Sequence, residues 1–358
     1  MIYDWLFSLT GSEILAAFIQ SLLPLFIFIL PFALFAVLLE RKVSGHMQDR
    51  LGPMRVGYHG ILQTVADIIK LVQKEDIVAK ANDKFFFDLA PVLVFMGSYA
   101  AFAAIPFTSI FIGAELDLGI IFIMAVTGLV VAGILMGGWA SDNKYSLLGA
   151  MRSAAQIISY EIPSLLVVLI VIMLAGSLDL YKISEWQTPY FWNWLILGGP
   201  EMGIAKILLI PLMILAALII FLSTLAEVNR TPFDIPEAES ELVSGYHTEY
   251  SGMKFAMFFL AEYANMFAVS AIVTALFFGG FQSPFGYLGD LFNLPWLVPI
   301  EQFFWFTAKG LFFVFVQMWL RWTLPRFRVD QLMTFCWKYL IPFAFVSLIL
   351  VGLITVLL

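Results

Sequence analysis

Long uninterrupted apolar stretches are the feature of this sequence that most restricts its fold. The segment 204–226 is apolar on every face, and similar stretches recur along a chain that is 61% hydrophobic and 13% charged. Stretches longer than roughly 18 apolar residues are typical of transmembrane helices, whereas a membrane β-barrel would show alternating segments of roughly 10 residues. We therefore predict an all-α polytopic membrane protein with a single transmembrane domain over residues 1–358.

The distribution of apolar and basic residues predicts the topology. The apolar stretches indicate eight spans, near residues 14–39, 85–107, 117–138, 162–180, 204–226, 255–279, 302–322 and 339–357. Sixteen of the 19 Lys and Arg residues fall in four alternate connections, at 40–84, 139–161, 227–254 and 321–338. Because basic residues concentrate in cytoplasmic loops, we expect these four connections inside the cell and both termini outside.

The sequence lacks the usual motifs for redox groups. With one cysteine, Cys336, the chain cannot form an internal disulfide or provide all the ligands of a cysteine-bound iron–sulfur cluster. Its three histidines have no metal-ligand spacing, and it has no Walker A loop or dinucleotide fingerprint. We expect no bound metal, covalent cofactor or nucleic-acid partner, and electron carriers, if any, in partner subunits.

The connection 40–84 is too long to be a simple link. Glycines at 52 and 57 indicate turns, and six apolar residues follow at helical spacing: Ile61, Leu62, Val65, Ile68, Ile69 and Val72. This pattern predicts a short amphipathic helix at the membrane surface. The basic residues Arg41, Lys42, Arg50 and Arg55 suit either a lipid-headgroup anchor or a surface that binds a peripheral partner and a polar substrate head.

Carboxylates are concentrated in the connection 227–254, beside apolar sequence. Asp234 and Glu237, with Pro236 between them, fit a capping box at a helix start. Glu237 and Glu241 would share one helix face with Glu239 nearby, where like charges repel and carboxylate pKa values rise. Such acids are candidates for a proton relay.

Three further acids lie at or near the predicted spans. Glu227 ends one span, and Glu262 lies about two turns into the next, where an unpaired charge costs about 2.5 to 3.5 kcal/mol. Glu161 lies shortly before Pro163, at the start of an apolar run. Its carboxylate either has a function or simply stabilises a helix N-terminus, and Tyr160 and Gln156 could also be its hydrogen-bond partners. The alternative for the whole acidic set is a structural network paired with Arg230 and Lys254.

Six ordered motifs carry a resemblance to a known family: ERKVSGHMQDRLGP, ADIIKL, GWASDNKYSLLGAMRSAAQIISYE, AEVNRTPFDIPEAESELVSG, EYSGMKFAMFFLAEYAN and LPRFRVDQLM. Together they resemble the H subunit of bacterial NADH:quinone oxidoreductase, respiratory complex I, and its mitochondrial counterpart, NADH dehydrogenase subunit 1. The resemblance runs from Glu40 to Lys338. One departure is Met54, where that family usually has Asn in a Gly-Pro-Asn turn.

The resemblance implies a subunit of the bacterial inner membrane that contacts other membrane subunits, docks the peripheral arm and forms most of the quinone entrance channel. The substrate would be ubiquinone or menaquinone, and flavin and iron–sulfur clusters would lie in partner subunits. By motif position the quinone route would include Arg41, Arg50, Asp67, Arg230 and Phe233. An acidic chain toward proton-pumping subunits would comprise Glu161, Glu227, Glu237, Glu239, Glu241 and Glu262. Apart from the resemblance, Lys309 is isolated within a span and needs either a carboxylate partner, for which Glu262 is a candidate, or a depressed pKa.

Two alternatives fit part of the pattern. A membrane subunit of a related energy-converting hydrogenase would share the acidic connection but differ in its electron-input partners. A proton-coupled secondary transporter should show internal repeats, and the sequence has no convincing repeat.

Overall fold

The computed structural model describes residues 2–200, 203, 205–236 and 239–357, and within these it is all-helical, as predicted. The N-terminal helices are α1 (Ile2–Thr10), α2 (Glu13–Pro24), α3 (Leu30–Met47), α4 (Gln63–Gln73), α5 (Lys84–Ala100), α6 (Gly119–Ala140) and α7 (Lys144–Ala175). The remaining helices are α8 (Leu180–Trp186), α9 (Ala205–Glu227), α10 (Glu239–Leu242), α11 (Gly252–Phe277), α12 (Leu288–Leu291), α13 (Val298–Thr323), α14 (Val329–Phe335) and α15 (Ile341–Leu357). One π-helical turn (Leu25–Ile29) joins α2 to α3, and another (Cys336–Leu340) joins α14 to α15.

In the described part of the chain, eight helical stretches are long and apolar enough to cross a membrane, which confirms the predicted number. Several predicted boundaries were wrong. The first stretch continues to Met47 rather than residue 39, and the last begins at Val329 rather than 339. The largest error concerns α7, which begins at Lys144 instead of 162 and ends at Ala175 instead of 180.

The physical reason is clearest in α7. Asn143 caps its start, because its side-chain oxygen accepts a hydrogen bond of 2.9 Å from the backbone N–H of Tyr145. The helix then runs through its polar first half and past Pro163 without ending. Polarity marks where a helix leaves the apolar zone, but backbone hydrogen bonds decide where the helix ends.

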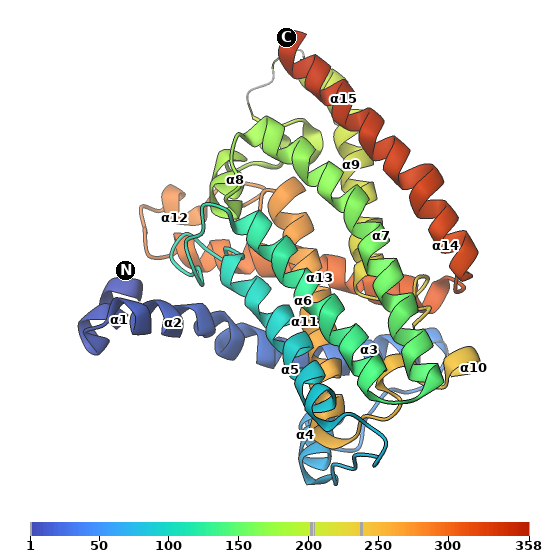
Figure 1. Cartoon of the computed structure of the whole chain (residues 1–358). Coiled ribbons are helices and arrows are strands. Elements are labelled where there is room, and N and C mark those ends of the chain that lie inside the picture. Colours follow the sequence, from blue (N-terminus) through green and yellow to red (C-terminus); the bar gives the residue numbers. More distant parts are fainter. Residues whose placement is uncertain (1, 201–202, 204, 237–238, 358) are drawn as a thin grey trace.

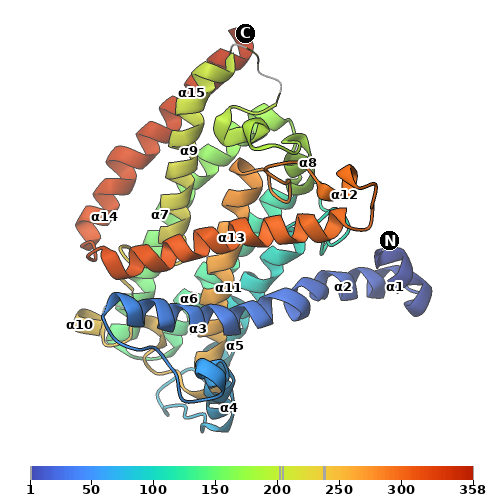
Figure 2. The ribbon, with the colours of Figure 1, turned by 180° about the vertical axis from the view of Figure 1, so that it is seen from behind.

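The spans form an upright bundle crossed by two strongly tilted helices. Helices α5, α6, α7, α9, α11 and α15 run upright, whereas the continuous α2–α3 helix and α13 lie across them (Figure 1, Figure 2). Among the eight spans of the described chain, α11 is the most enclosed, with 67% of its most apolar window buried, and the α14–α15 stretch is the least enclosed, with 22%. Phe267 of α11 packs where these helices cross. Its ring centroid lies 4.7 Å from that of Phe28, which precedes α3, and 6.3 Å from that of Phe107, on which it stacks. The central position of α11 gives its side chains access to both tilted helices.

Two glycines, Gly138 in α6 and Gly149 in α7, allow close backbone approach. A Cβ atom added to Gly138 would lie 2.3 Å from the Cβ of Ala150, and one added to Gly149 would lie 2.8 Å from the Cα of Gly245. The segment after α10 therefore packs directly on the backbone of α7.

Three of the four connections predicted to be cytoplasmic gather at one end of the bundle, whereas the fourth, 321–338, which includes α14, lies nearer the middle of the view (Figure 1). Helix α4, helix α10 and the turn between α6 and α7 lie at the lower end in Figure 1, whereas α8 and α12 lie toward the opposite end. This arrangement agrees with alternating spans. Which end faces the cytoplasm stays a prediction from the basic residues.

Candidate functional site

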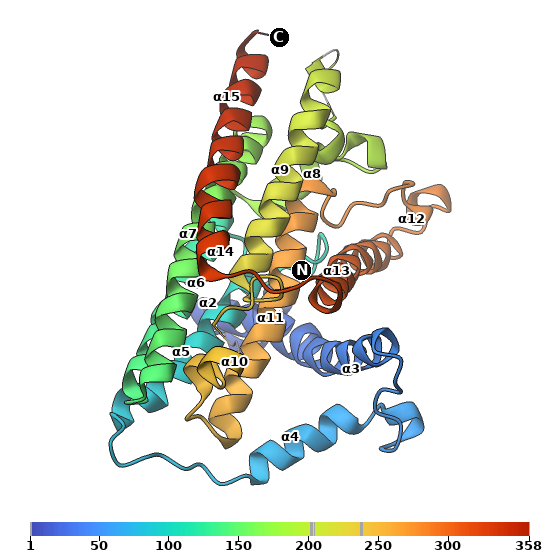
Figure 3. The same ribbon diagram turned by 90° about the vertical axis from the view of Figure 1, so that its right-hand side faces the viewer.

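Side chains of α3, α4 and α11 line a cleft. Figure 3 shows where these three helices lie, toward the end of the bundle that carries α4. The cleft has a volume of ≈ 360 Å³, and its walls include apolar side chains of α3 (Leu34, Val37), α4 (Ile68, Leu71) and α11 (Met253, Phe255, Phe259, Leu260). Polar groups lie among them: Arg41 and Asp67 form an ion pair of 2.5 Å, and Gln63 donates a hydrogen bond of 3.1 Å to Asp67. The cleft thus combines apolar walls with a charged rim.

Helix α4 confirms the predicted amphipathic helix. It spans Gln63–Gln73, and Ile68 faces the cleft, while Val65, Ile69 and Val72 are exposed on the free chain. Lys70 and Lys74 also line the cleft. The helix therefore contributes one wall of the cleft and turns other apolar side chains outward.

A buried ion network lies beside the cleft, centred on Arg230. Its guanidinium Nη1 is 2.8 and 3.0 Å from the two carboxylate oxygens of Glu40, and its Nε is 2.9 Å from Glu262. The hydroxyl of Tyr263 donates a hydrogen bond of 2.7 Å to Glu40, and Arg321 forms a second ion pair with the same carboxylate. Arg230 is 2% and Glu40 5% exposed. The network therefore balances two carboxylates with two guanidinium groups, of which Arg230 and Glu40 are buried and Glu262 and Arg321 are partly exposed.

The network draws its members from α3, α11, α13 and the segment after α9. Although burial alone would lower the pKa of Arg230, the carboxylates of Glu262 and Glu40 raise it above its usual value. Arg230 also lies over the ring of Tyr263, 4.8 Å from its centroid. The arginine thus remains a fixed positive charge around which the acids are held.

Two predicted ion partners were wrong. Lys309 does not pair with Glu262; its ammonium group donates to the carbonyls of Phe278 (2.7 Å) and Gln282 (2.9 Å) and lies 4.5 Å from the ring centroid of Trp194. Carbonyl oxygens at the end of α11 satisfy this buried lysine instead of a carboxylate.

Lys254 also differs from the expected structural network. Its ammonium group pairs with Asp76 at 2.6 Å and Asp88 at 2.5 Å. These acids belong to the connection after α4 and to α5, because the first turn of α11 faces those elements.

The segment after Arg230 is fixed by hydrogen bonds and aromatic packing. The side-chain amide of Gln156 donates to the carbonyls of Ala226 and Phe233, both at 2.8 Å. Phe233 is fully buried, 5.4 Å from the ring of Tyr160 and 5.7 Å from that of Phe327. Of the predicted quinone-route residues, Arg41 and Asp67 line the cleft, while Arg230 and Phe233 are buried behind it.

Asp234 does not cap a helix, so the predicted capping box was wrong. Its carboxylate accepts a hydrogen bond of 2.8 Å from Arg326, and helix α10 begins at Glu239. Burial raises the pKa of Asp234, although the nearby positive charge of Arg326 opposes this shift. Glu237 lies outside the described residues, as does the side chain of Glu239. Arg50 lies away from the cleft and donates to Gln48 at 2.7 Å.

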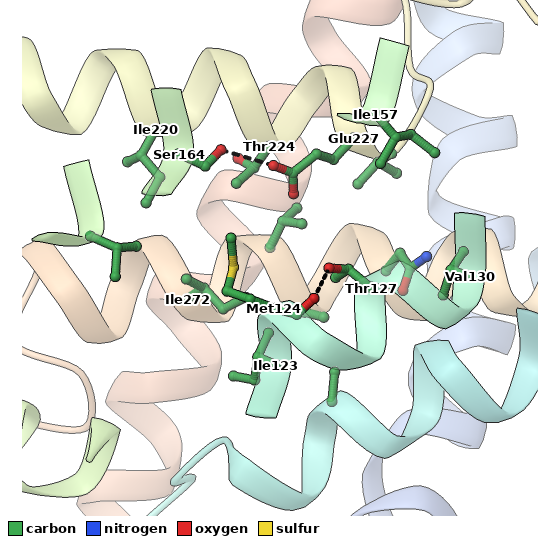
Figure 4. A pocket seen from close by; sticks show the side chains of 16 residues that line it. Ile123, Met124, Thr127, Val130, Ile157, Ser164, Ile220, Thr224, Glu227 and Ile272 are labelled. Carbon is green, nitrogen blue, oxygen red and sulfur yellow. Dashed lines mark hydrogen bonds between the residues drawn. The ribbon is translucent and has the colours of Figure 1, made fainter. Parts of the chain in front are cut away.

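Glu227 lines a small cavity inside the bundle, between α6, α7, α9 and α11 (Figure 4). Ser164 donates a hydrogen bond of 2.8 Å to its carboxylate. The cavity has a volume of ≈ 60 Å³ and is otherwise lined mainly by apolar side chains, with Thr127, Thr224 and Asn265 as further polar groups. This volume suits a few water molecules, since one requires about 10 to 15 Å³.

Glu161 lies in the middle of α7, not at a helix N-terminus, so that interpretation was wrong. The suggested local partners were also wrong: the Tyr160 hydroxyl donates to the carbonyl of Leu332, and the Gln156 amide donates elsewhere. Glu161 is half-buried and precedes Ser164 by about one helical turn.

Among the described acids of the predicted chain, Glu241 lies at the surface. It is exposed and pairs with Arg152 of α7 at 2.6 Å. The structure thus places Glu227 at the small cavity, Glu161 about one turn before its partner Ser164, and Glu262 in the ion network.

Sequence reasoning missed Glu40, Tyr263, Arg321 and Ser164. Glu40 had a signal, because it is an acid at the apolar end of a span, directly before Arg41. Tyr263 and Ser164 had none, since a single hydroxyl in a span is common. Among the described residues, no group of three His, Cys, Asp or Glu side chains is arranged to hold a metal ion.

Comparison with known proteins identifies the family. The family model for NADH dehydrogenase matches residues 19–352. The chain belongs to this family. It is 53% identical to the H subunit of the NADH-quinone oxidoreductase of Chlorobium luteolum over 343 residues, which cover 95% of this chain and 89% of the relative. It is 50% identical to the H subunit of Chlorobaculum parvum (98% and 96% covered) and 45% identical to that of Geobacillus thermodenitrificans (98% of each).

Proposed function

We propose that this chain is the H subunit of a proton-pumping NADH-quinone oxidoreductase of the bacterial inner membrane. The relatives carry that name over nearly their whole length, and eight spans suit a membrane subunit. Flavin and iron–sulfur clusters belong to partner subunits, and this chain supplies the quinone route and the start of a proton relay. Quinone, as ubiquinone or menaquinone, is its substrate.

The cleft between α3, α4 and α11 carries the quinone part of the proposal. An isoprenoid tail is apolar and gains free energy by leaving water for walls such as Phe259 and Leu260. The quinone head has two carbonyl oxygens, which accept hydrogen bonds from a guanidinium such as that of Arg41. Arg41 adjoins Glu40 in α3, so the rim of the cleft and the buried network occupy neighbouring positions of one helix. Arg230 and Phe233 act at the inner end of this route, and Arg50 guides the head group from outside.

The acids carry the proton part of the proposal. Reduction of a quinone to a quinol takes up two protons and creates transient negative charge, which shifts the protonation of nearby carboxylates. Glu262 lies in the ion network, and Glu227 lines the small cavity of Figure 4. Glu161 lies about one helical turn before Ser164, which donates a hydrogen bond to Glu227. We place Glu237, Glu239 and Glu241 on the same relay; of these, the described side chain of Glu241 is exposed and could face a peripheral subunit.

The quinone route is tested by filling the cleft with a larger side chain. Ile68→Trp places an indole in the cleft, whereas Ile69→Trp places it on the exposed side of the same helix and serves as a matched control. In the assembled complex we expect Ile68→Trp to lower kcat/KM for quinone by roughly tenfold, a loss of about 1.4 kcal/mol. NADH oxidation by an artificial acceptor that bypasses the quinone site should not change. Equal quinone kinetics in the two variants would refute the route.

The relay is tested by Glu227→Gln, with the exposed Glu185→Gln of α8 as control. Removal of a proton-transfer group typically lowers the rate by about 10² or more. We therefore expect quinone-linked proton pumping in proteoliposomes to fall strongly in Glu227→Gln only. Undiminished pumping per quinone reduced, at an unchanged rate, would exclude Glu227 from the relay.

A further inference from the structure

A seam of contacts joins the segment after α4 to the start of α11. The backbone N–H of Ile77 donates to the hydroxyl of Ser251 (3.3 Å), which in turn donates to the carbonyl of Glu75 (3.2 Å). Gly252 has a positive φ of +57°, and a Cβ atom there would lie 3.1 Å from the carbonyl oxygen of Lys74. The two segments, residues 74–77 and 251–254, therefore touch along their backbones.

Lys254 connects these two segments to helix α5. Its ammonium group lies 2.6 Å from Asp76, 2.5 Å from Asp88 of α5, and 5.2 Å from the ring centroid of Phe87. A positive charge in the first turn of a helix is unfavourable, because it faces the positive end of the helix dipole. Lys254 therefore does not stabilise α11 itself. The two carboxylates offset the unfavourable position and fasten α11 to its neighbours.

Polar contacts contribute to holding helix α4 in position. Val65, Ile69 and Val72 are exposed, and Ile68 and Leu71 are only half-buried, so apolar burial supplies only part of the stabilisation. One such contact is the ion pair between Arg41 of α3 and Asp67 of α4. The other is the seam at Lys254, beyond the C-terminal end of α4. The cleft lies between these two fastenings.

The seam is continuous with the wall of the cleft. Met253 and Phe255, which flank Lys254 in sequence, both line the cleft, and so does Lys74 on the opposite segment. A displacement of residues 74–77 away from α11 would therefore change the separation of these walls directly.

We propose that Lys254 is a positioning residue: by joining Asp76 and Asp88 it fixes the separation of α4 from α11, and so controls the passage of a quinone tail through the cleft. The passage part rests on the proposed function. The fastening of α4 does not, and the two parts are tested by different measurements.

The fastening is measured by hydrogen exchange in the assembled complex. The variants are Lys254→Met, the conservative Lys254→Arg, and Lys144→Met, which removes an exposed lysine from the first turn of α7 as a matched control. We expect amides of residues 63–83 to exchange about fivefold faster in Lys254→Met, as for the loss of partly exposed ion pairs. Lys254→Arg and Lys144→Met should match the wild type. Unchanged exchange in Lys254→Met would overturn the proposal.

The passage is measured by steady-state kinetics in proteoliposomes, with the long-tailed quinone of the native membrane and an analogue that has the same head but a truncated tail. We expect Lys254→Met to raise KM several-fold for the long-tailed quinone, less for the analogue, with kcat per complex unchanged, and Lys254→Arg to restore KM. An equal loss of kcat for both quinones is what a merely structural role would give, and it would overturn the proposal.

Ile68→Trp, assayed beside these variants, separates the two levels of failure. If Ile68→Trp raises KM but Lys254→Met does not, despite faster exchange, Lys254 does not control the passage. If neither variant alters quinone kinetics, the cleft is not the quinone route and the passage part fails with the proposed function.

Discussion

Substitution of Glu40 by glutamine removes one negative charge from the ion network while keeping nearly the same side-chain shape. In the wild type, Glu40 and Glu262 balance Arg230 and Arg321; in the variant the network carries one excess positive charge. Arg230 and Glu40 are almost fully buried, so solvent does not screen their interaction. Breaking one side of such a buried pair costs about 3 to 5 kcal/mol. The loss of the Arg321 contact adds less, because Arg321 is partly exposed.

The assay is the free energy of unfolding of the purified full chain in mixed micelles, titrated with SDS and followed by the fluorescence of its ten tryptophans. We expect Glu40→Gln to lose about 3 kcal/mol or more. The double variant Glu40→Gln/Arg321→Gln restores the charge balance, so its loss should be smaller than the sum of the single losses by about 1 kcal/mol. The exposed Glu185→Gln should change stability by less than about 0.5 kcal/mol. A loss below about 1 kcal/mol for Glu40→Gln would refute charge balance as the basis of the network.

Further predictions concern the half-buried His247 and two glycines. Burial lowers the pKa of His247 to about 4, below its ordinary 6.5; its contribution to stability is therefore complete above pH 6.5 and declines as the pH falls toward 4. Between pH 7 and pH 5 the wild type should therefore lose about 2 kcal/mol of unfolding free energy through His247. His247→Gln lacks this titrating group, so its unfolding free energy should fall by about 2 kcal/mol less over the same range. Identical pH profiles for the two proteins would contradict this prediction. Gly149→Ala should destabilise by about 1 to 3 kcal/mol, because its Cβ would meet Gly245. Gly128→Ala, at a position of α6 where an added Cβ would meet no atom within 4 Å, should raise the unfolding free energy by about 0.5 to 1 kcal/mol. If the two glycine variants changed stability equally in the same SDS titration, close packing at Gly149 would not explain its effect.

The number and order of the spans were predictable because each apolar stretch must satisfy its own backbone in lipid as a helix. Their ends were less predictable. Helix α7 continues into the polar residues from 144 onward, and the first span continues through the charged residues Glu40 and Arg41. Apolar composition reports the lipid boundary, whereas the helix itself continues as long as its amide groups find partners. The strong tilt of α3 and α13 could not be read from composition.

The functional residues were predictable as types but not as partners. Arg230 and Glu262 were correctly singled out as charges that need compensation, and the structure pairs them. Glu40, the second partner of Arg230, is 190 residues away in sequence, and Arg321 is 281 residues from Glu40. No local spacing rule relates positions so distant. Lys309 shows the converse limit, because carbonyl groups at a helix end, invisible in the sequence, replace the expected carboxylate.

The adjacency of Glu40 and Arg41 gives the proposed coupling a physical basis. Consecutive residues of an α-helix point about 100° apart, so α3 presents Arg41 to the cleft and Glu40 to the ion network. If a quinone head draws the Arg41 guanidinium away from Asp67, the local charge beside Glu40 changes without any movement of the bundle. We propose that Arg230 passes that change on to Glu262, because its guanidinium pairs with Glu40 through Nη1 and with Glu262 through Nε. This short chain of contacts would link the cleft to the first acid of the proposed relay.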